Sequence, residues 1–98
     1  MGIPKKKKPP KNKKVDSMTL VDFSDMKIPG ICVHNHPTDF PDKIIARVIE
    51  AATNGVTNVY AEYETMEDCR KDIAAAGFVI VMPRCPEDDL HIVETYFR

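Results

Sequence analysis

The chain has 98 residues, of which 43% are hydrophobic and 30% are charged, and it contains no Trp. This composition predicts one small globular domain, and no apolar run approaches the roughly 20 residues of a membrane-spanning helix, so no membrane partner is expected. The formal net charge of −1 combines two opposite regions, because residues 1–14 hold seven Lys, whereas residues 15–98 hold seven Lys/Arg against fifteen Asp/Glu.

The first 16 residues combine a block of lysines with Pro4, Pro9 and Pro10. Proline has no N–H to donate, and so polar a segment buries too little apolar surface to offset the entropy of ordering. We therefore predict a disordered Lys/Pro-rich arm over residues 1–16, followed by a single compact α/β domain over residues 17–98. The arm is expected to contact nucleic-acid phosphates without base specificity, through Lys5, Lys6, Lys7, Lys8, Lys11, Lys13 and Lys14.

Two other interpretations of the arm stay open. The segment Pro4-Lys5-Lys6-Lys7-Lys8 resembles a monopartite nuclear localisation signal. Alternatively, the arm only keeps the protein soluble and has no specific target. No aromatic side chain lies among the lysines, so the arm itself does not predict stacking on single-stranded bases.

The N-terminal region and the cysteines both indicate an intracellular protein. The lysines are followed by Val15-Asp16-Ser17 rather than by the apolar segment of a secretory signal. The three cysteines are an odd number at irregular spacing, which predicts no disulfide framework. We expect a reducing compartment, the cytoplasm or, in a eukaryotic host, the nucleus.

The first half of the domain predicts two strands and a helix. Met18–Phe23 and Lys27–His36 are rich in β-prone residues and are expected to pair as neighbouring strands. From Thr38 or Asp39, which suit a helix N-cap, an amphipathic helix is predicted to run to Asn54-Gly55. Its apolar positions recur at three- and four-residue spacing: Ile44, Ile45, Val48, Ile49 and Ala52.

The second half predicts a further helix between strands. Thr57–Glu64 alternates as a strand near a sheet edge does, and Thr65 opens a helix that ends before Gly77. Phe78–Met82 is continuously apolar, which is typical of a central strand covered on both faces. The last segment has both helix-start and strand features, and its residues Ile92–Phe97 favour a strand.

The order of these elements is β-β-α-β-α-β-β. Because strand–helix–strand crossovers give parallel neighbours, the expected fold class is α/β, with a small, mixed but largely parallel sheet of four to five strands and two helices. An α+β arrangement is the alternative fold class. An open sheet edge is expected at Tyr60–Glu64 or at Leu90–Phe97.

The densest group of chemically active side chains is Cys32-Val33-His34-Asn35-His36. Residues two apart on a strand point the same way, so Cys32, His34 and His36 are predicted to line one face. Thiolate and imidazole are zinc ligands, and three protein ligands with an open position are the arrangement of a catalytic zinc. A zinc-binding domain or zinc-dependent hydrolase is therefore an alternative function, with Cys85 and His91 as additional candidates.

A ligand site is also predicted at the end of this strand, at His36, Thr38 and Asp39, because ligands bind at strand ends and helix N-termini. The string His34-Asn35-His36-Pro37 resembles the motif of the RadC and JAB/JAMM metalloprotease-like families. The resemblance spans four residues. In those families a serine and then a metal-binding aspartate follow, where this chain has Ile44 and Arg47, so their activity is not carried over.

The leading functional hypothesis is a small intracellular accessory protein without enzymatic activity and without a cofactor. Its basic arm contacts nucleic acid, and its acidic domain binds an unidentified protein. The alternatives are the zinc site described above and a self-associating structural subunit.

Overall fold

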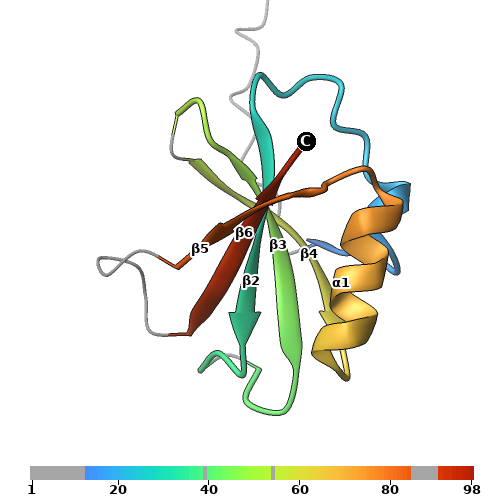
Figure 1. Cartoon of the computed structure of the whole chain (residues 1–98), viewed down its shortest axis with the longest axis vertical. Helices are drawn as coiled ribbons and strands as arrows, with labels where there is room; N and C mark the ends of the chain where they lie inside the picture. The colour runs from blue at the N-terminus through green and yellow to red at the C-terminus, as the bar shows by residue number, and fades with distance from the viewer. Residues whose placement is uncertain (1–12, 39, 54, 85–90) are drawn as a thin grey trace, which may run out of the picture.

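The computed structural model describes residues 13–38, 40–53, 55–84 and 91–98, and it contains one sheet with one α-helix packed on one of its faces (Figure 1). In the described residues the chain order is β1 (Lys13–Lys14), a 3₁₀ helix η1 (Met18–Leu20), β2 (Pro29–Asn35), β3 (Ile44–Glu50), β4 (Gly55–Tyr63), α1 (Met66–Ala75), β5 (Ile80–Pro83) and β6 (Ile92–Phe97). The strands lie side by side in the order β1-β4-β3-β2-β6-β5.

The predicted α/β class with a largely parallel sheet and two helices is wrong. All pairings between described strands are antiparallel except that of β1 with β4. The described residues form a mostly antiparallel six-stranded sheet with a single α-helix. The reason is that β2 and β3 are joined by a short connection rather than by a crossover helix, and a short connection can only join antiparallel neighbours.

The helix predicted from Thr38 to Asn54 is the source of this error, since its apolar part forms β3 instead. The spacing of its apolar residues fits a helix, but it also fits a strand that is buried on both faces. Ile44, Ala46 and Val48 face the core, while Ile45, next along the strand, is 1% exposed on the opposite face. The β-branched residues of this run favour the strand.

Two further elements differ from expectation. Residues 18–20 form η1 instead of a strand, with the Ser17 hydroxyl accepting from the backbone N–H of Thr19 at 3.1 Å as an N-cap. The apolar segment at residues 78–82 does contain strand β5, but β5 lies at the sheet edge, and all four of its residues are exposed. An apolar run indicates a strand without telling where in the sheet that strand lies.

The second predicted helix, the strand before it and the C-terminal strand are confirmed as α1, β4 and β6. The Thr65 hydroxyl caps α1 by accepting from the N–H of Asp68 at 3.1 Å, and Gly77 ends the helix with a positive φ of 93°. The predicted open edge at residues 90–97 is wrong for the described part, because β6 lies between β2 and β5. No helix in the described residues is long and apolar enough to cross a membrane.

The core lies between the sheet and the layer formed by α1 and η1. We call this side of the sheet the covered face. Phe78 and Met18 are fully buried there, and the Phe78 ring packs edge-on against Phe23 with a centroid distance of 4.8 Å. The Arg98 guanidinium lies 4.9 Å from the centroids of both rings. Burial of these side chains is the main source of stability for so small a domain.

Two carboxylates connect the layers of the covered face. Asp72 of α1 accepts hydrogen bonds from the Ser17 hydroxyl at 2.5 Å, from the Met18 N–H at 2.8 Å and from the Tyr63 hydroxyl. Although burial acts to raise its pKa, these hydrogen bonds hold the Asp72 pKa below its ordinary value. They therefore fasten η1 and β4 to α1 through one ionised side chain.

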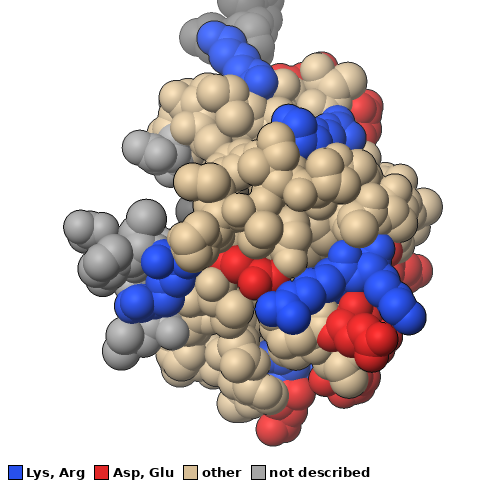
Figure 2. Space-filling view, in the orientation of Figure 1, with Lys and Arg blue, Asp and Glu red and all other residues tan. Residues whose placement is uncertain are grey.

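Glu94 of β6 forms the second link, because it accepts two hydrogen bonds from the Arg70 guanidinium, at 3.0 and 3.1 Å, and one from the Tyr96 hydroxyl. Here too burial acts to raise the pKa of Glu94, and its hydrogen bonds to Arg70 and Tyr96 lower it. Figure 2 shows acidic and basic side chains meeting near the middle of this side of the molecule. The bidentate geometry fixes α1 against the strand.

Candidate ligand site on the open face of the sheet

The face of the sheet opposite α1 carries Lys14, Cys32 and His34, three of the side chains that the sequence marks as functional. We call it the open face, since no described helix covers it. Strand register places one residue from each strand in a row across this face. From edge to edge the row is Lys14, Tyr60, Arg47, Cys32, Thr95 and Met82.

A second row lies beside the first, and in it His34 has Ile45 and Ile92 as cross-strand partners. Arg47 and His34 are therefore diagonal neighbours on two adjacent strands, which places their Cβ atoms roughly 7–8 Å apart. Side chains of this length can reach the same small ligand. The predicted common face of Cys32 and His34 is confirmed by their pairing in these two rows.

The connection between β2 and β3 folds over one end of the open face. We call its described residues, 36–38 and 40–43, the rim loop. His36 adopts a left-handed backbone conformation with a φ of 51°, and its N–H donates to the carbonyl of Lys43 at 3.0 Å. The His36 Nδ1–H donates to the carbonyl of Pro41 at 2.7 Å. These bonds hold both ends of the loop together.

Two side chains fasten the rim loop to the sheet. The Phe40 ring lies 5.3 Å from the centroid of Tyr60, which is 8% exposed beneath it. The Lys43 ammonium bonds Glu64 at 2.5 Å, and this hydrogen bond raises the pKa of Lys43 above its ordinary value. The loop is thus positioned by an aromatic contact on one face and an ion pair at the end of β4.

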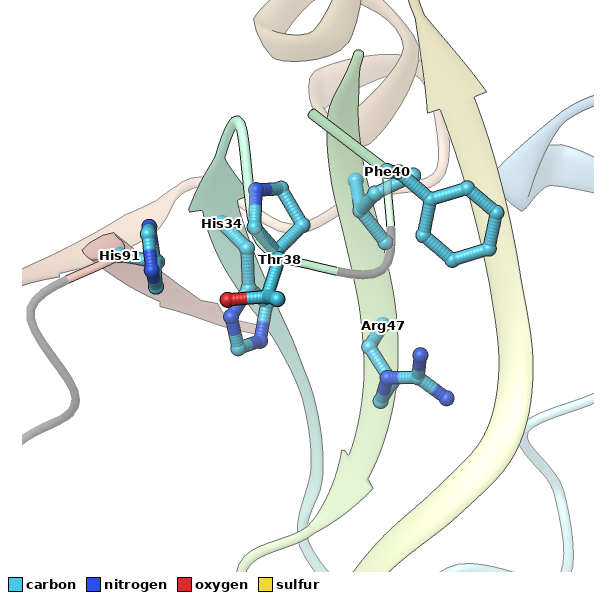
Figure 3. A pocket seen from close by; sticks show the side chains of 7 residues that line it. His34, Thr38, Phe40, Arg47 and His91 are labelled. Atoms are coloured by element: carbon cyan, nitrogen blue, oxygen red, sulfur yellow. The ribbon is translucent and has the colours of Figure 1, made fainter. Parts of the chain in front are cut away.

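A pocket of about 360 Å³ lies between the rim loop and the sheet (Figure 3). Its volume is near the lower end of the range of small-molecule sites. Its apolar lining comes from Pro37, Phe40 and Ile45, and its polar lining from His34, Thr38, Arg47 and His91. Figure 3 shows that these side chains come from β2, β3, the start of β6 and the rim loop.

The pocket is lined by nitrogen donors and by no carboxylate of a described residue. Arg47 donates one long hydrogen bond, of 3.5 Å to the carbonyl of Thr57, and its guanidinium lies 5.4 Å from the centroid of Tyr60. Among the described residues it has no acidic partner, whereas Arg70 on the covered face binds Glu94 in bidentate fashion. A guanidinium has five N–H donors, so Arg47 keeps several for a ligand.

The predicted zinc ligands are only partly brought together. His36 leaves the face of Cys32 and His34, because the chain turns at its left-handed backbone and its ring bonds Pro41. Cys32 is 7% exposed, and its sulfur lies 3.7 Å from the Thr95 hydroxyl that donates to it. In the described ranges no three His, Cys, Asp or Glu side chains are grouped closely enough to hold a metal ion. Zinc binding stays a prediction; Cys85 lies outside these ranges.

The predicted ligand site at His36, Thr38 and Asp39 overlaps the pocket through Thr38 alone. Asp39 lies outside the described residues. Arg47, Phe40 and Ile45 also line the pocket and were not predicted from the sequence. Arg47 is a cation inside an apolar run, and this is the signal that would have identified it, since a charged residue seldom occupies a buried strand without a role.

Of the seven lysines in the predicted arm, Lys13 and Lys14 are described, and the other five lie outside the described residues. Both belong to β1, and the next residue, Val15, donates its N–H to the carbonyl of Tyr60 at 2.8 Å. The described strand β1 therefore lies within the first 16 residues. Lys14 lies 3.6 Å from Glu62, in an ion pair whose lysine side chain is 54% exposed and whose glutamate side chain is 20% exposed.

Comparison of the chain with protein-family models, with curated proteins and with solved structures gave no match.

Proposed function

We propose that this protein is a small intracellular accessory protein, without enzymatic activity, that contacts nucleic acid through its N-terminal lysines and a protein partner through its acidic domain. The observation that carries the proposal is the separation of charge. Seven of the fourteen cationic side chains lie within residues 5–14, and the remainder of the chain has a formal charge of −8. Lysine clusters bind phosphate backbones without reading the sequence.

The position of β1 supports this role. Lys14 stands in the same cross-strand row as Tyr60 and Arg47, so its side chain lies on the open face rather than on the helix side. The Lys14 side chain is 54% exposed, so a polyanion can reach it although it is ion-paired with Glu62.

The acidic domain suits a basic protein partner. Glu62, Glu64, Glu67 and Asp68 lie within seven residues at the end of β4 and the start of α1. Figure 2 shows acidic side chains gathered around that end of the helix. Such a concentration repels nucleic acid and attracts a positively charged protein surface. The two halves of the proposal therefore assign different partners to regions of opposite charge.

A salt titration of duplex-DNA binding tests the nucleic-acid half. The variant replaces Lys5, Lys6, Lys7, Lys8 and Lys11 with Gln and leaves β1 unchanged. Because each phosphate contact contributes about 0.9 to the slope of log K against log salt, we expect the magnitude of the slope to fall by up to roughly 4.5. Fluorescence anisotropy of a labelled duplex at several salt concentrations measures it.

The matched control replaces Lys27 and Lys71 with Gln, which removes cations from the folded domain but leaves the cluster intact. The control should keep the wild-type slope. Equal affinity and slope for the wild type and the five-lysine variant would contradict the proposal that the N-terminal lysines bind nucleic acid.

A further inference from the structure

We propose that the pocket on the open face binds a phosphate monoester whose organic part is small and apolar. This inference does not rest on the function of the lysine cluster, because all residues that carry it belong to the folded domain. It rests on the residues that line the pocket, on the unpaired donors of Arg47 and on the way the rim loop is built.

The polar half of the pocket defines the head group. The polar lining comprises a guanidinium, two imidazoles and a hydroxyl, from Arg47, His34, His91 and Thr38. A tetrahedral phosphate has three terminal oxygens that point in different directions, so it can contact polar groups on several sides of a pocket, whereas the two oxygens of a carboxylate lie in one plane and match a single guanidinium. The described lining contains no carboxylate to repel the anion. These features select a phosphate.

The apolar half defines the body of the ligand. Ile45, which is 1% exposed, forms part of the sheet surface at the pocket, and Phe40 and Pro37 contribute from the rim loop. Phe40 is itself held against Tyr60, so this wall is in place before a ligand arrives. A preformed apolar wall favours a flat or compact group and lowers the entropic cost of binding. A free inorganic phosphate leaves this surface unused.

The position of Arg47 makes it the anchor of the site. Its guanidinium is held over Tyr60 at 5.4 Å, and its bond to Thr57 is long, so it is oriented without being neutralised. His34 lies diagonally across from it on β2, and the carbonyl of His91, the residue before β6, accepts from the N–H of Asn35 at 2.8 Å. Arg47 and His34 therefore lie on adjacent strands, and the backbone bond to Asn35 places His91 beside the end of β2.

The test is an NMR titration of ¹⁵N-labelled full-length protein with phenyl phosphate. We expect saturable shift changes centred on the backbone amides of Thr38, Phe40, Ile45 and Arg47. Phenol, inorganic phosphate and benzoate each lack one part of the proposed ligand and should bind at least roughly tenfold more weakly. Benzoate binding as tightly as phenyl phosphate would overturn the assignment of the head group.

Substitutions then locate the site. Arg47→Gln and His34→Gln are separate variants, and each should weaken binding of phenyl phosphate, by roughly tenfold or more for Arg47→Gln because a charge-assisted bond is lost. Lys71→Gln removes a cation from α1, on the covered side, and should leave affinity unchanged. Thermal unfolding identifies any variant that fails to fold, and two variants keep the test decisive if one does.

The five-lysine variant separates this inference from the proposed function. Phenyl phosphate should bind it as tightly as it binds the wild type, because no substituted residue belongs to the pocket. Loss of binding in that variant, shift changes confined to residues near the N-terminus, or full affinity in both Arg47→Gln and His34→Gln would overturn the proposal.

Discussion

The two faces of the sheet carry different kinds of side chain although they share the same strands. On the covered face the carboxylates of Asp72 and Glu94 are each held by several hydrogen bonds, and the fully buried positions are apolar. On the open face Arg47 has no acidic partner among the described residues, and a loop rather than a helix encloses the surface. Stability is therefore concentrated on one side and binding capacity on the other.

The comparison shows how a small domain accommodates both demands. Covering both faces with helices would leave no concave surface, and a domain of this length has little chain to spare. Here the rim loop covers only one end of the open face, where it contributes to the burial of Ile45 and Tyr60. The same loop forms one wall of the pocket, so one segment serves both packing and recognition.

The largest effect is expected from breaking the covered face. Phe78→Ala removes a fully buried ring that contacts Phe23, and large-to-small changes of this kind cost about 3–5 kcal/mol. We expect a loss of that size in the free energy of unfolding measured with urea. Met82→Ala, at a half-exposed position of β5, is the control and should cost less than about 1 kcal/mol. Similar losses in both variants would contradict the assignment of the core.

A smaller effect is expected from crowding the open face at Gly30. A Cβ at this position of β2 would lie 2.8 Å from Cε1 of Phe97 and 3.0 Å from Cγ1 of Ile49. Gly30→Ala should therefore lower the free energy of unfolding by roughly 1–3 kcal/mol, since overpacking forces neighbours to move. Adding Phe97→Leu should restore part of the loss. If Gly30→Ala were as stable as the wild type, the close approach of these side chains would be refuted.

The smallest expected effect is a pH dependence of the covered face. The folded-state pKa of Asp72 is lowered, so its contribution is complete above the unfolded-state value of about 4 and is lost as pH falls through the folded-state value. On acidification, the free energy of unfolding should fall less in Asp72→Asn than in the wild type, by on the order of 1 kcal/mol. The difference is this small because solvent screens a partly exposed carboxylate. Unfolding curves between about pH 5 and pH 2.5 measure it.

Glu67→Gln provides the comparison for this experiment, because it removes an exposed carboxylate from the same helix. Its stability should follow pH as the wild type does. Some acid dependence should also remain in Asp72→Asn, since the lowered pKa of Glu94 acts in the same direction. An Asp72→Asn curve that matches the wild type at every pH would show that this carboxylate contributes nothing by its charge.

Local signals predicted the elements that local interactions determine. The cap at Thr65 and the stop at Gly77 identify α1, and alternation identifies β4. The run that forms β3 carries no such cap or alternation, because the spacing of apolar residues in a strand buried on both faces also fits a helix. Only its tertiary partners β2 and β4 decide between the two structures.

The candidate site was predictable to the extent that it lies on one strand. Alternation correctly placed Cys32 and His34 on a common face. The same alternation misplaced His36, because this residue has a left-handed backbone conformation that turns the chain before Pro37. The residue types alone do not predict that conformation. Arg47 belongs to the site only through cross-strand register, which depends on how β2 and β3 pair. Sites that combine residues from several strands therefore cannot be predicted from local sequence patterns.

The short strand β1 has a practical consequence for any attempt to trim the N-terminus. By pairing with β4 at Val59 and Tyr60, it shields the outer edge of a long strand whose backbone would otherwise be free to recruit strands from other molecules. A truncation after residue 12 would retain β1, whereas a truncation after residue 14 would remove it. The shorter protein would then differ from the wild type in its tendency to aggregate as well as in its missing lysines.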